Sequence, residues 1–440
     1  MKTFKTIYLV AALIIAYAPS GFSQAAVHFI GSVEFKISGA MSESALRNFL
    51  SINPPLREGE EFTSPEALSA FLDRKRQDLI NDRVFKSVEL SDEIGETVDG
   101  RTGHAVTIEV VDAFSLFPLP YPSYDSNSGF LLGVETHYDN AFGTMTNWYL
   151  DSYLVLRTRD GATGVGKWRI HPKISNLVVA GLPLTLDLLF DRQENQNIVE
   201  DTLVADWACY KASADLGTTF HFAEDWYYKP GLIAYSSFGF QDFLGYSSFN
   251  RDLFGLSATN TVGFGRVDWD GNFRKGFDAN GYATVSGLDR NEVFGLTGEL
   301  GASVSWYLPW KSLDYYGRVH AQYSINDEPT GLGSWLRGIK NSTMSGVSGA
   351  FVNQSLAIDL IPWKGVLDLQ IHPFADAGIV FPTSRSFNPG SDLRFGAGAD
   401  IVLFIDAISN FLIRCTVGMD MGSSAPLDHV EVILNTGLSY

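Results

Sequence analysis

The stretch "LPLTLDLLFD" (residues 182–191) alternates apolar and polar side chains along most of its length. Leu184, Leu186 and Leu188 fall on one face of an extended chain, and Thr185 and Asp187 fall on the other. A period of two residues is the signature of a β-strand with one apolar and one polar face, because successive side chains of a strand point to opposite sides. The segment therefore predicts a strand that separates two different environments.

The same alternation recurs from residue 113 to the carboxyl end, as in "NFLIRCTVGMD" (410–420) and "HVEVILNTGLSY" (429–440). Sixteen such segments fall at roughly 113–123, 128–139, 145–157, 164–175, 182–192, 204–222, 226–239, 253–267, 273–287, 292–307, 313–325, 349–361, 366–381, 392–405, 409–421 and 428–440. An even number of antiparallel strands is what single-chain bacterial membrane barrels require. We predict an all-β transmembrane barrel over residues 113–440.

Alternation alone does not say which face points outward, so a large soluble β-protein stays open as an alternative. The amino terminus favours the membrane. Lys2 and Lys5 precede an apolar run at 7–18, which is shorter than the ~20 residues of a membrane-spanning helix, and small residues follow it. We predict a signal peptide over residues 1–23, and hence an exported chain.

Composition and motifs argue against several functions. The net charge of −18 disfavours nucleic acid as a partner. Cys209 and Cys415 are too few and too far apart in sequence for a disulfide framework. The stretch "GATGVGKW" (161–168) nearly matches a phosphate-binding loop, but Trp168 stands where Ser or Thr would hold magnesium. Because the eight histidines are scattered singly, we expect no catalysis, no metal site and no cofactor.

Residues 27–112 have a different pattern. A strand pattern at 27–37 is followed by two amphipathic helix patterns, capped by Ser42 and Ser64, and by two further strand patterns. This order predicts a small α+β domain with one sheet. It resembles a POTRA domain, with Phe85 at the transition from helix to strand. The resemblance implies binding of extended segments at a sheet edge. A generic small domain remains the alternative.

The stretch "GLGSWLRGIKNSTMSG" (331–346) holds Arg337 and Gly338 in a predicted long loop. Strand parity places Asp376 and Gly378 of "FADAG" (374–378) on the inner face of a later strand. The same argument turns Asp359 of "NQSLAIDL" (353–360) inward.

Together, "LRGI" (336–339), the inward "FADAG", "DNAFGT" (139–144) and an aromatic last residue resemble the BamA/TamA superfamily of outer-membrane assembly proteins. The resemblance implies that the loop folds back into the lumen and that Arg337 meets Asp376, with Asp359 as a second acceptor. Leu438 and Tyr440 would then belong to a terminal-strand signal. The chain departs from the pattern at Ile339, where an aromatic is usual, and in having one POTRA domain.

The resemblance also implies a location and partners. The barrel would lie in the outer membrane lipid with its amino-terminal domain in the periplasm. Unfolded outer-membrane proteins would be clients, recruited at the domain's sheet edge or at the barrel seam, and accessory subunits would be further partners. A passive barrel, porin-like or a structural surface antigen without assembly activity, is the alternative function.

The first barrel segment, "AFSLFPLPYPSY" (113–124), carries Pro118, Pro120 and Pro122 at alternate positions. Alternate residues direct their backbone groups to the same neighbour, so three hydrogen-bond donors are missing from one edge of this strand. If that edge faces the last strand, the seam of the barrel is weak. The alternative is an extended proline-rich linker in front of the barrel.

Overall fold

The computed structural model describes residues 27–436 apart from 53, 99–100, 114–115, 126–128, 160–161, 180, 200–201, 224, 245–251, 291–292, 327–329, 341–342, 364–365, 383–385, 406–411 and 423–429. The predicted signal peptide, Leu438 and Tyr440 lie outside the described residues. No described helix is both long enough and apolar enough to cross a membrane.

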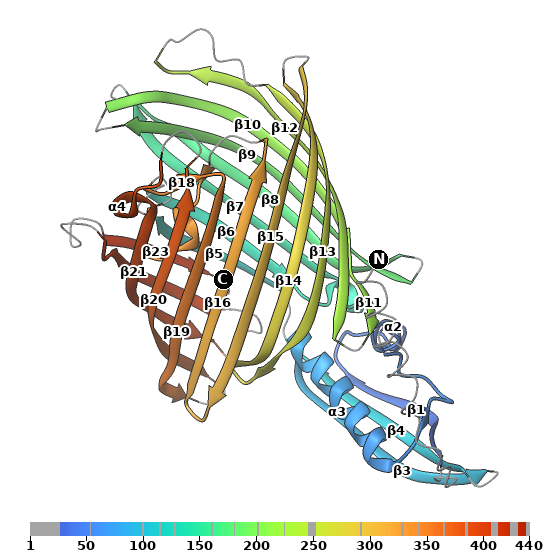
Figure 1. The fold of residues 1–440 in the computed structure, drawn as a ribbon. Helices are drawn as coiled ribbons and strands as arrows, with labels where there is room; N and C mark the ends of the chain where they lie inside the picture. Colours follow the sequence, from blue (N-terminus) through green and yellow to red (C-terminus); the bar gives the residue numbers. More distant parts are fainter. Residues whose placement is uncertain are drawn as a thin grey trace, which may run out of the picture. The chain divides into compact units, whose positions relative to one another are not determined.

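The amino-terminal part contains a four-stranded sheet in the order β2-β1-β4-β3 and two helices (Figure 1). The elements are β1 (His28–Ser38), α2 (Glu43–Leu50), β2 (Glu61–Phe62), α3 (Pro65–Asp82), β3 (Phe85–Val98) and β4 (Arg101–Asp112). The Ser42 hydroxyl accepts the Ala45 N–H, and Ser64 accepts the Ala67 N–H, so both helices begin at the caps that the sequence predicts. The observed order is the predicted one with the two-residue β2 added.

By contacts, the chain forms two compact units. One comprises the described residues up to Lys36 with Leu56–Arg76 and Glu89–Glu109. The other comprises Ile37–Pro55, Gln77–Val88 and the described residues from Val110 onward. The units interleave along the sequence, and the domain boundary expected between residues 112 and 113 stays a prediction.

The second unit contains a closed antiparallel barrel (Figure 1). Its strands are β5 (Leu116–Asp125), β6 (Gly129–Tyr138), β7 (Asn147–Arg159), β8 (Ala162–Val179), β9 (Leu182–Val199), β10 (Thr202–Thr218), β11 (Phe220–Ala223), β12 (Trp226–Asp242), β13 (Leu253–Asp270), β14 (Phe273–Arg290), β15 (Val293–Trp310), β16 (Leu313–Ile325), β19 (Ser348–Trp363), β20 (Leu367–Phe381), β21 (Leu393–Phe404), β22 (Leu412–Asp420) and β23 (Val430–Thr436). Since β10 and β11 both pair with β12 and only Thr219 separates them, these seventeen described segments make sixteen strands. The predicted fold class is confirmed.

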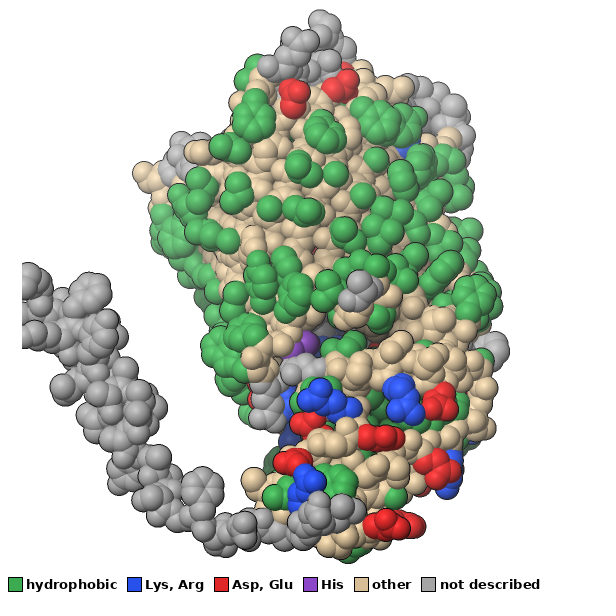
Figure 2. Space-filling model, turned by 90° about the vertical axis from the view of Figure 1, so that its right-hand side faces the viewer, with side chains coloured by type: hydrophobic (Ala, Val, Ile, Leu, Met, Phe, Trp, Pro, Cys, Tyr) green, Lys and Arg blue, Asp and Glu red, His purple; other side chains and the backbone are tan. Residues whose placement is uncertain are grey.

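The barrel wall is apolar outside and polar inside. Phe190 is 45% exposed, whereas its neighbour Asp191 is 2% exposed. Figure 2 shows hydrophobic side chains spread over the face of the barrel that it presents. A soluble barrel would put its apolar face inward, so the observed orientation excludes the soluble alternative and fits a wall surrounded by lipid.

Short elements lie in the connections between strands. The 3₁₀ turns are η1 (Ala141–Gly143) and η2 (Gly333–Trp335), and a four-residue helix, α4 (Pro389–Asp392), precedes β21. Strands β17 (Thr330–Gly331) and β18 (Ser345–Gly346) pair with each other in the connection between β16 and β19. We call this connection, residues 326–347, the lumenal loop.

Candidate functional site

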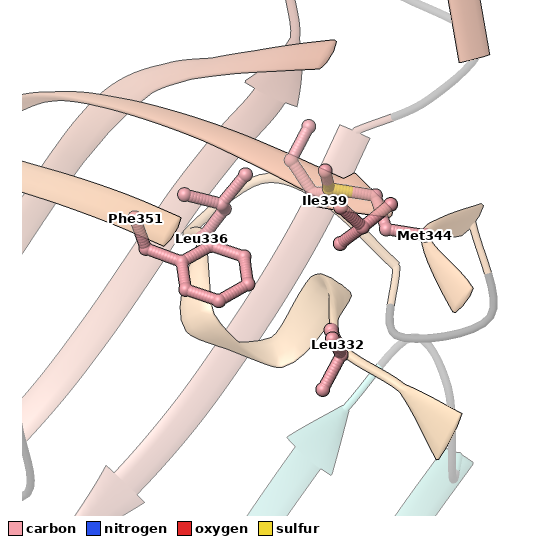
Figure 3. Close-up of a cluster of buried hydrophobic side chains, with 6 residues drawn as sticks. Leu332, Leu336, Ile339, Met344 and Phe351 are labelled. Atoms are coloured by element: carbon pink, nitrogen blue, oxygen red, sulfur yellow. The ribbon is translucent and has the colours of Figure 1, made fainter. Parts of the chain in front are cut away.

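The lumenal loop is anchored by a small hydrophobic core of its own. Leu332, Leu336, Ile339 and Met344 of the loop are buried together with Phe351 of β19 and Val380 of β20. Figure 3 shows these loop side chains beside Phe351. A loop that buries four apolar side chains against the barrel wall gains free energy from removing them from water, although its glycine and serine content would otherwise favour a mobile surface segment.

Trp335 adds an aromatic contact on one side of this core. Its ring stacks on His320 of β16 with a centroid separation of 3.8 Å, and the Arg318 guanidinium lies 5.1 Å from its centroid. The Trp335 carbonyl accepts a hydrogen bond from the Asn353 side chain. The loop is thus attached to β16 and β19 before it reaches Arg337.

Glycines on the wall make room for the loop backbone. A Cβ at Gly418 of β22 would lie 2.8 Å from the Gly338 Cα, and a Cβ at Gly396 of β21 would meet the Arg337 carbonyl. At Gly378, a Cβ would lie 2.6 Å from the Phe351 ring and 2.9 Å from Leu336. These three positions therefore require glycine because the loop approaches them closely.

Arg337 reaches Asp376 through three hydrogen bonds. Its Nε and backbone N–H donate to Asp376 Oδ2 at 2.9 and 3.0 Å, and its Nη2 donates to Oδ1 at 2.7 Å. The Asp376 side chain is fully buried, and the guanidinium also lies 4.0 Å from the Phe374 ring centroid. Burial disfavours the charged guanidinium, but the hydrogen bonds to Asp376 and its negative charge outweigh that effect and raise the pKa of Arg337.

The second carboxylate at Arg337 is Asp400 of β21, which the sequence analysis did not single out. Arg337 Nη1 donates to Asp400 Oδ2 at 3.2 Å and to the Ser355 hydroxyl at 2.8 Å. Asp400 also accepts from Arg414 and from the Thr416 hydroxyl. Two buried carboxylates and two arginines thus form one network, in which each charge has an opposite neighbour.

Asp359 does not have the role expected of it as second acceptor. Within the described part of the chain, the Asp359 carboxylate accepts a hydrogen bond from the Gln370 side chain at 2.8 Å. The pairing of β19 with β20 shifts register between Asp359 and Ile361, and both Leu360 and Ile361 are exposed. This β-bulge follows Asp359 directly, and strand parity alone could not show it.

Gly338 connects the loop to the last described strand. Its backbone N–H donates to Glu431 Oε2 of β23 at 2.9 Å, and Glu431 is buried. The φ angle of Gly338 is +81°, a conformation that residues with a side chain rarely adopt. Arg337 therefore binds β20 and β21, whereas Gly338 binds β23.

The proline-rich segment is the first barrel strand, β5, and not a linker. It pairs with β6 from Leu116 to Asp125, and with β23 through Asp125–Ile433 and Tyr124–Leu434. Pro118, Pro120 and Pro122 lie opposite residues of β6. Because proline has no N–H, the N–H groups that bond to β6 must come from the residues between the prolines. The prolines' backbone groups consequently face the β23 side, where three donors are missing.

The remaining motifs show no reactive arrangement. "GATGVGKW" runs into β8, which begins at Ala162, so it opens no helix. In "DNAFGT", Asn140 and Phe142 have positive φ angles, and the Asn140 side chain accepts the Met145 N–H. No group of three or more metal-ligating side chains suited to an ion occurs within the described part of the chain.

Comparisons with solved structures agree with this architecture. CdiB from Escherichia coli matches 93% of this chain and 76% of its own, with a TM-score of 0.61 and 15% identity. CdiB from Acinetobacter baumannii matches 94% of this chain and 74% of its own, with a TM-score of 0.57 and 13% identity. BamA from Haemophilus ducreyi lacking POTRA domains 1–3 matches with a TM-score of 0.49, 13% identity and coverage of 93% and 84%.

No family model and no curated protein sequence matches the chain. At such low identities the two CdiB structures establish the fold and not the activity. The fold is that of the two CdiB structures, and the apolar outer wall identifies the chain as a membrane β-barrel.

Proposed function

We propose that this protein resides in the outer membrane, with its amino-terminal domain in the periplasm, and inserts or translocates other β-strand proteins. The observation that carries the proposal is the junction of β5 with β23. Strand β5 meets β23 through Tyr124–Leu434 and Asp125–Ile433, and it pairs with β6 on its other side. The prolines remove three donors from the edge that faces β23. A junction in which one strand lacks three N–H donors is the place where the barrel opens most easily.

An opened junction offers a template to a client. The carbonyls and N–H groups of β23 become free when β5 moves away, and an extended client segment can pair with them as an added strand. Because backbone groups make these bonds, many client sequences can be accepted. Each backbone hydrogen bond contributes about 1 kcal/mol net, so exchanging a few weak seam bonds for client bonds requires no external energy source.

The amino-terminal sheet provides a second pairing edge. Its outer strands are β2 and β3, and β3 extends from Phe85 to Val98. A client segment or an accessory subunit that adds to β3 would be held on the periplasmic side before it reaches the barrel. The protein needs no cofactor and no covalent step for this task.

A passive pore is the other candidate. The lumenal loop buries Leu336, Ile339 and Met344 against the inner wall and is fixed by Arg337. Such a loop occupies lumenal space that an open pore leaves to water, so the anchored loop favours the assembly role.

Reconstitution separates the two functions. Vesicles carrying the purified protein are given an unfolded client barrel, and insertion is followed by the client's resistance to added protease. We expect faster insertion than into vesicles carrying heat-denatured protein. Single-channel conductance is recorded on the same preparation. A steady large conductance without accelerated insertion would establish the passive pore instead.

A further inference from the structure

Glu431 contacts the lumenal loop and belongs to β23, the strand that pairs with β5 at the seam. It is the one acidic residue in β23, it is buried, and its carboxylate accepts the Gly338 N–H at 2.9 Å. It also pairs in register with Gly418 of β22, whose missing side chain admits the Gly338 backbone. A charge-assisted hydrogen bond out of contact with water is among the stronger ones in a protein.

The two halves of the "LRGI" stretch hold different parts of the wall. Arg337 binds Asp376 of β20 and Asp400 of β21, whereas Gly338 binds β23, the strand that meets β5. If β23 parts from β5 and bends outward, Glu431 moves with it while Asp376 and Asp400 stay. The Gly338 N–H would then lose its acceptor, unless the loop moves with β23 and gives up the contacts of Arg337 with Asp376 and Asp400.

We propose that Glu431 couples the lumenal loop to the seam, so that parting of β23 from β5 and release of the loop are linked events. The inference rests on the proposed function, in which the seam opens to admit a client. Linkage is reciprocal: a seam that is held shut stabilises the anchored loop, and a released loop makes the seam easier to open. Glu431 is a positioning residue in this scheme, since it touches the loop and not the client.

Trypsin cleavage after Lys340 reports on the loop. Lys340 is exposed, but cutting requires the surrounding chain to leave the wall. Loss of a buried hydrogen bond to a charged group should raise cleavage of Glu431→Ala about 10- to 100-fold. Glu431→Gln keeps an oxygen acceptor and should stay within about threefold of the parent. Unchanged cleavage in Glu431→Ala would overturn the inference.

A disulfide across the seam tests the coupling itself. In a Cys209→Ser/Cys415→Ser background, Tyr124→Cys and Leu434→Cys join β5 to β23, since these residues are register partners. We expect the closed disulfide to slow loop cleavage when residue 431 is glutamate and to have no effect when it is alanine. If the disulfide slows loop cleavage equally with glutamate and with alanine at residue 431, or slows it with neither, the coupling is contradicted.

The chain supplies a matched control at the same position. Cys415 of β22 is the register partner of Leu434 on its other side. With the native Cys415 kept, Leu434→Cys alone joins β22 to β23 and leaves the seam free, so cleavage should not slow. If Glu431→Ala fails to fold, the two disulfides can still be compared in the protein that keeps Glu431. A seam disulfide that does not protect the lumenal loop from trypsin would refute the proposal. None of these readouts uses a client, so this inference and the proposed function can fail separately.

Discussion

At the scale of residues, the site consists of charges that the sequence could pair only in part. Parity along one strand predicted that Asp376 faces inward, and the resemblance connected it with Arg337. Asp400 was missed although it lies in the same inward set as Gly396 and Gly398, because parity marks a carboxylate as lumenal without naming its partner. Glu431 was also missed, because its donor is the Gly338 backbone N–H, which no side-chain pattern reveals.

Removing either partner of the Arg337–Asp376 pair should release the loop. Arg337→Ala leaves the buried Asp376 without a countercharge, and Asp376→Ala leaves Arg337 with Asp400 alone. Breaking a buried pair costs about 3 kcal/mol or more, so each variant should raise cleavage after Lys340 about 100-fold. The double variant should be no worse than either single one, since the same interaction is lost. Asp359→Asn is the control, because Asp359 contacts Gln370, and it should leave cleavage unchanged. Additive effects would show that the arginine and the aspartate act separately.

The glycines of the wall provide a test that leaves every charge in place. Gly396→Ala puts a methyl group against the Arg337 carbonyl, so the loop should be displaced and cleavage after Lys340 should rise at least tenfold. Gly295→Ala on β15 is the matched control, because a Cβ there meets no atom within 4 Å. A displaced loop in both variants, measured by the same proteolysis, would point to a general weakening of the barrel instead.

At the level of the elements, the strands were predictable, but the register of the closing strand pair was not. The two-residue period marked all sixteen strands, with ends mostly a few residues from the observed ones, because each strand of the wall has one apolar and one polar face. The pairing of β5 with β23 joins the two ends of the barrel sequence, and no local pattern reports such a contact. The bulge at Leu360 also escaped prediction, since it changes register without changing composition.

Restoring the missing donors should tighten the seam. Replacing Pro118, Pro120 and Pro122 by valine returns three N–H groups to the edge that faces β23, each worth about 1 kcal/mol if it finds an acceptor. The unboiled protein should then convert to its slow-migrating form at a higher temperature during electrophoresis, and client insertion should be slower. A lower conversion temperature would mean that the prolines fit this strand better than valine does.

At the level of the whole molecule, we expect the protein to behave as an integral membrane barrel. A closed ladder of backbone hydrogen bonds has no edge at which detergent can begin unfolding, so the unboiled protein should migrate faster than the boiled one. The protein should sediment with the membrane fraction and resist carbonate extraction. Recovery in a soluble fraction would refute the architecture, whatever the loop does.

Client insertion by disulfide-locked protein tests whether clients enter through the seam. Vesicles carry either the seam-locked Tyr124→Cys/Leu434→Cys protein in the cysteine-free background or the Leu434→Cys protein joined to native Cys415. Insertion of an unfolded client barrel is measured before and after reduction. We predict that the seam lock abolishes insertion and that reductant restores it, while the β22–β23 lock has no effect. Full insertion by the oxidised, seam-locked protein would rule out entry of clients through the seam.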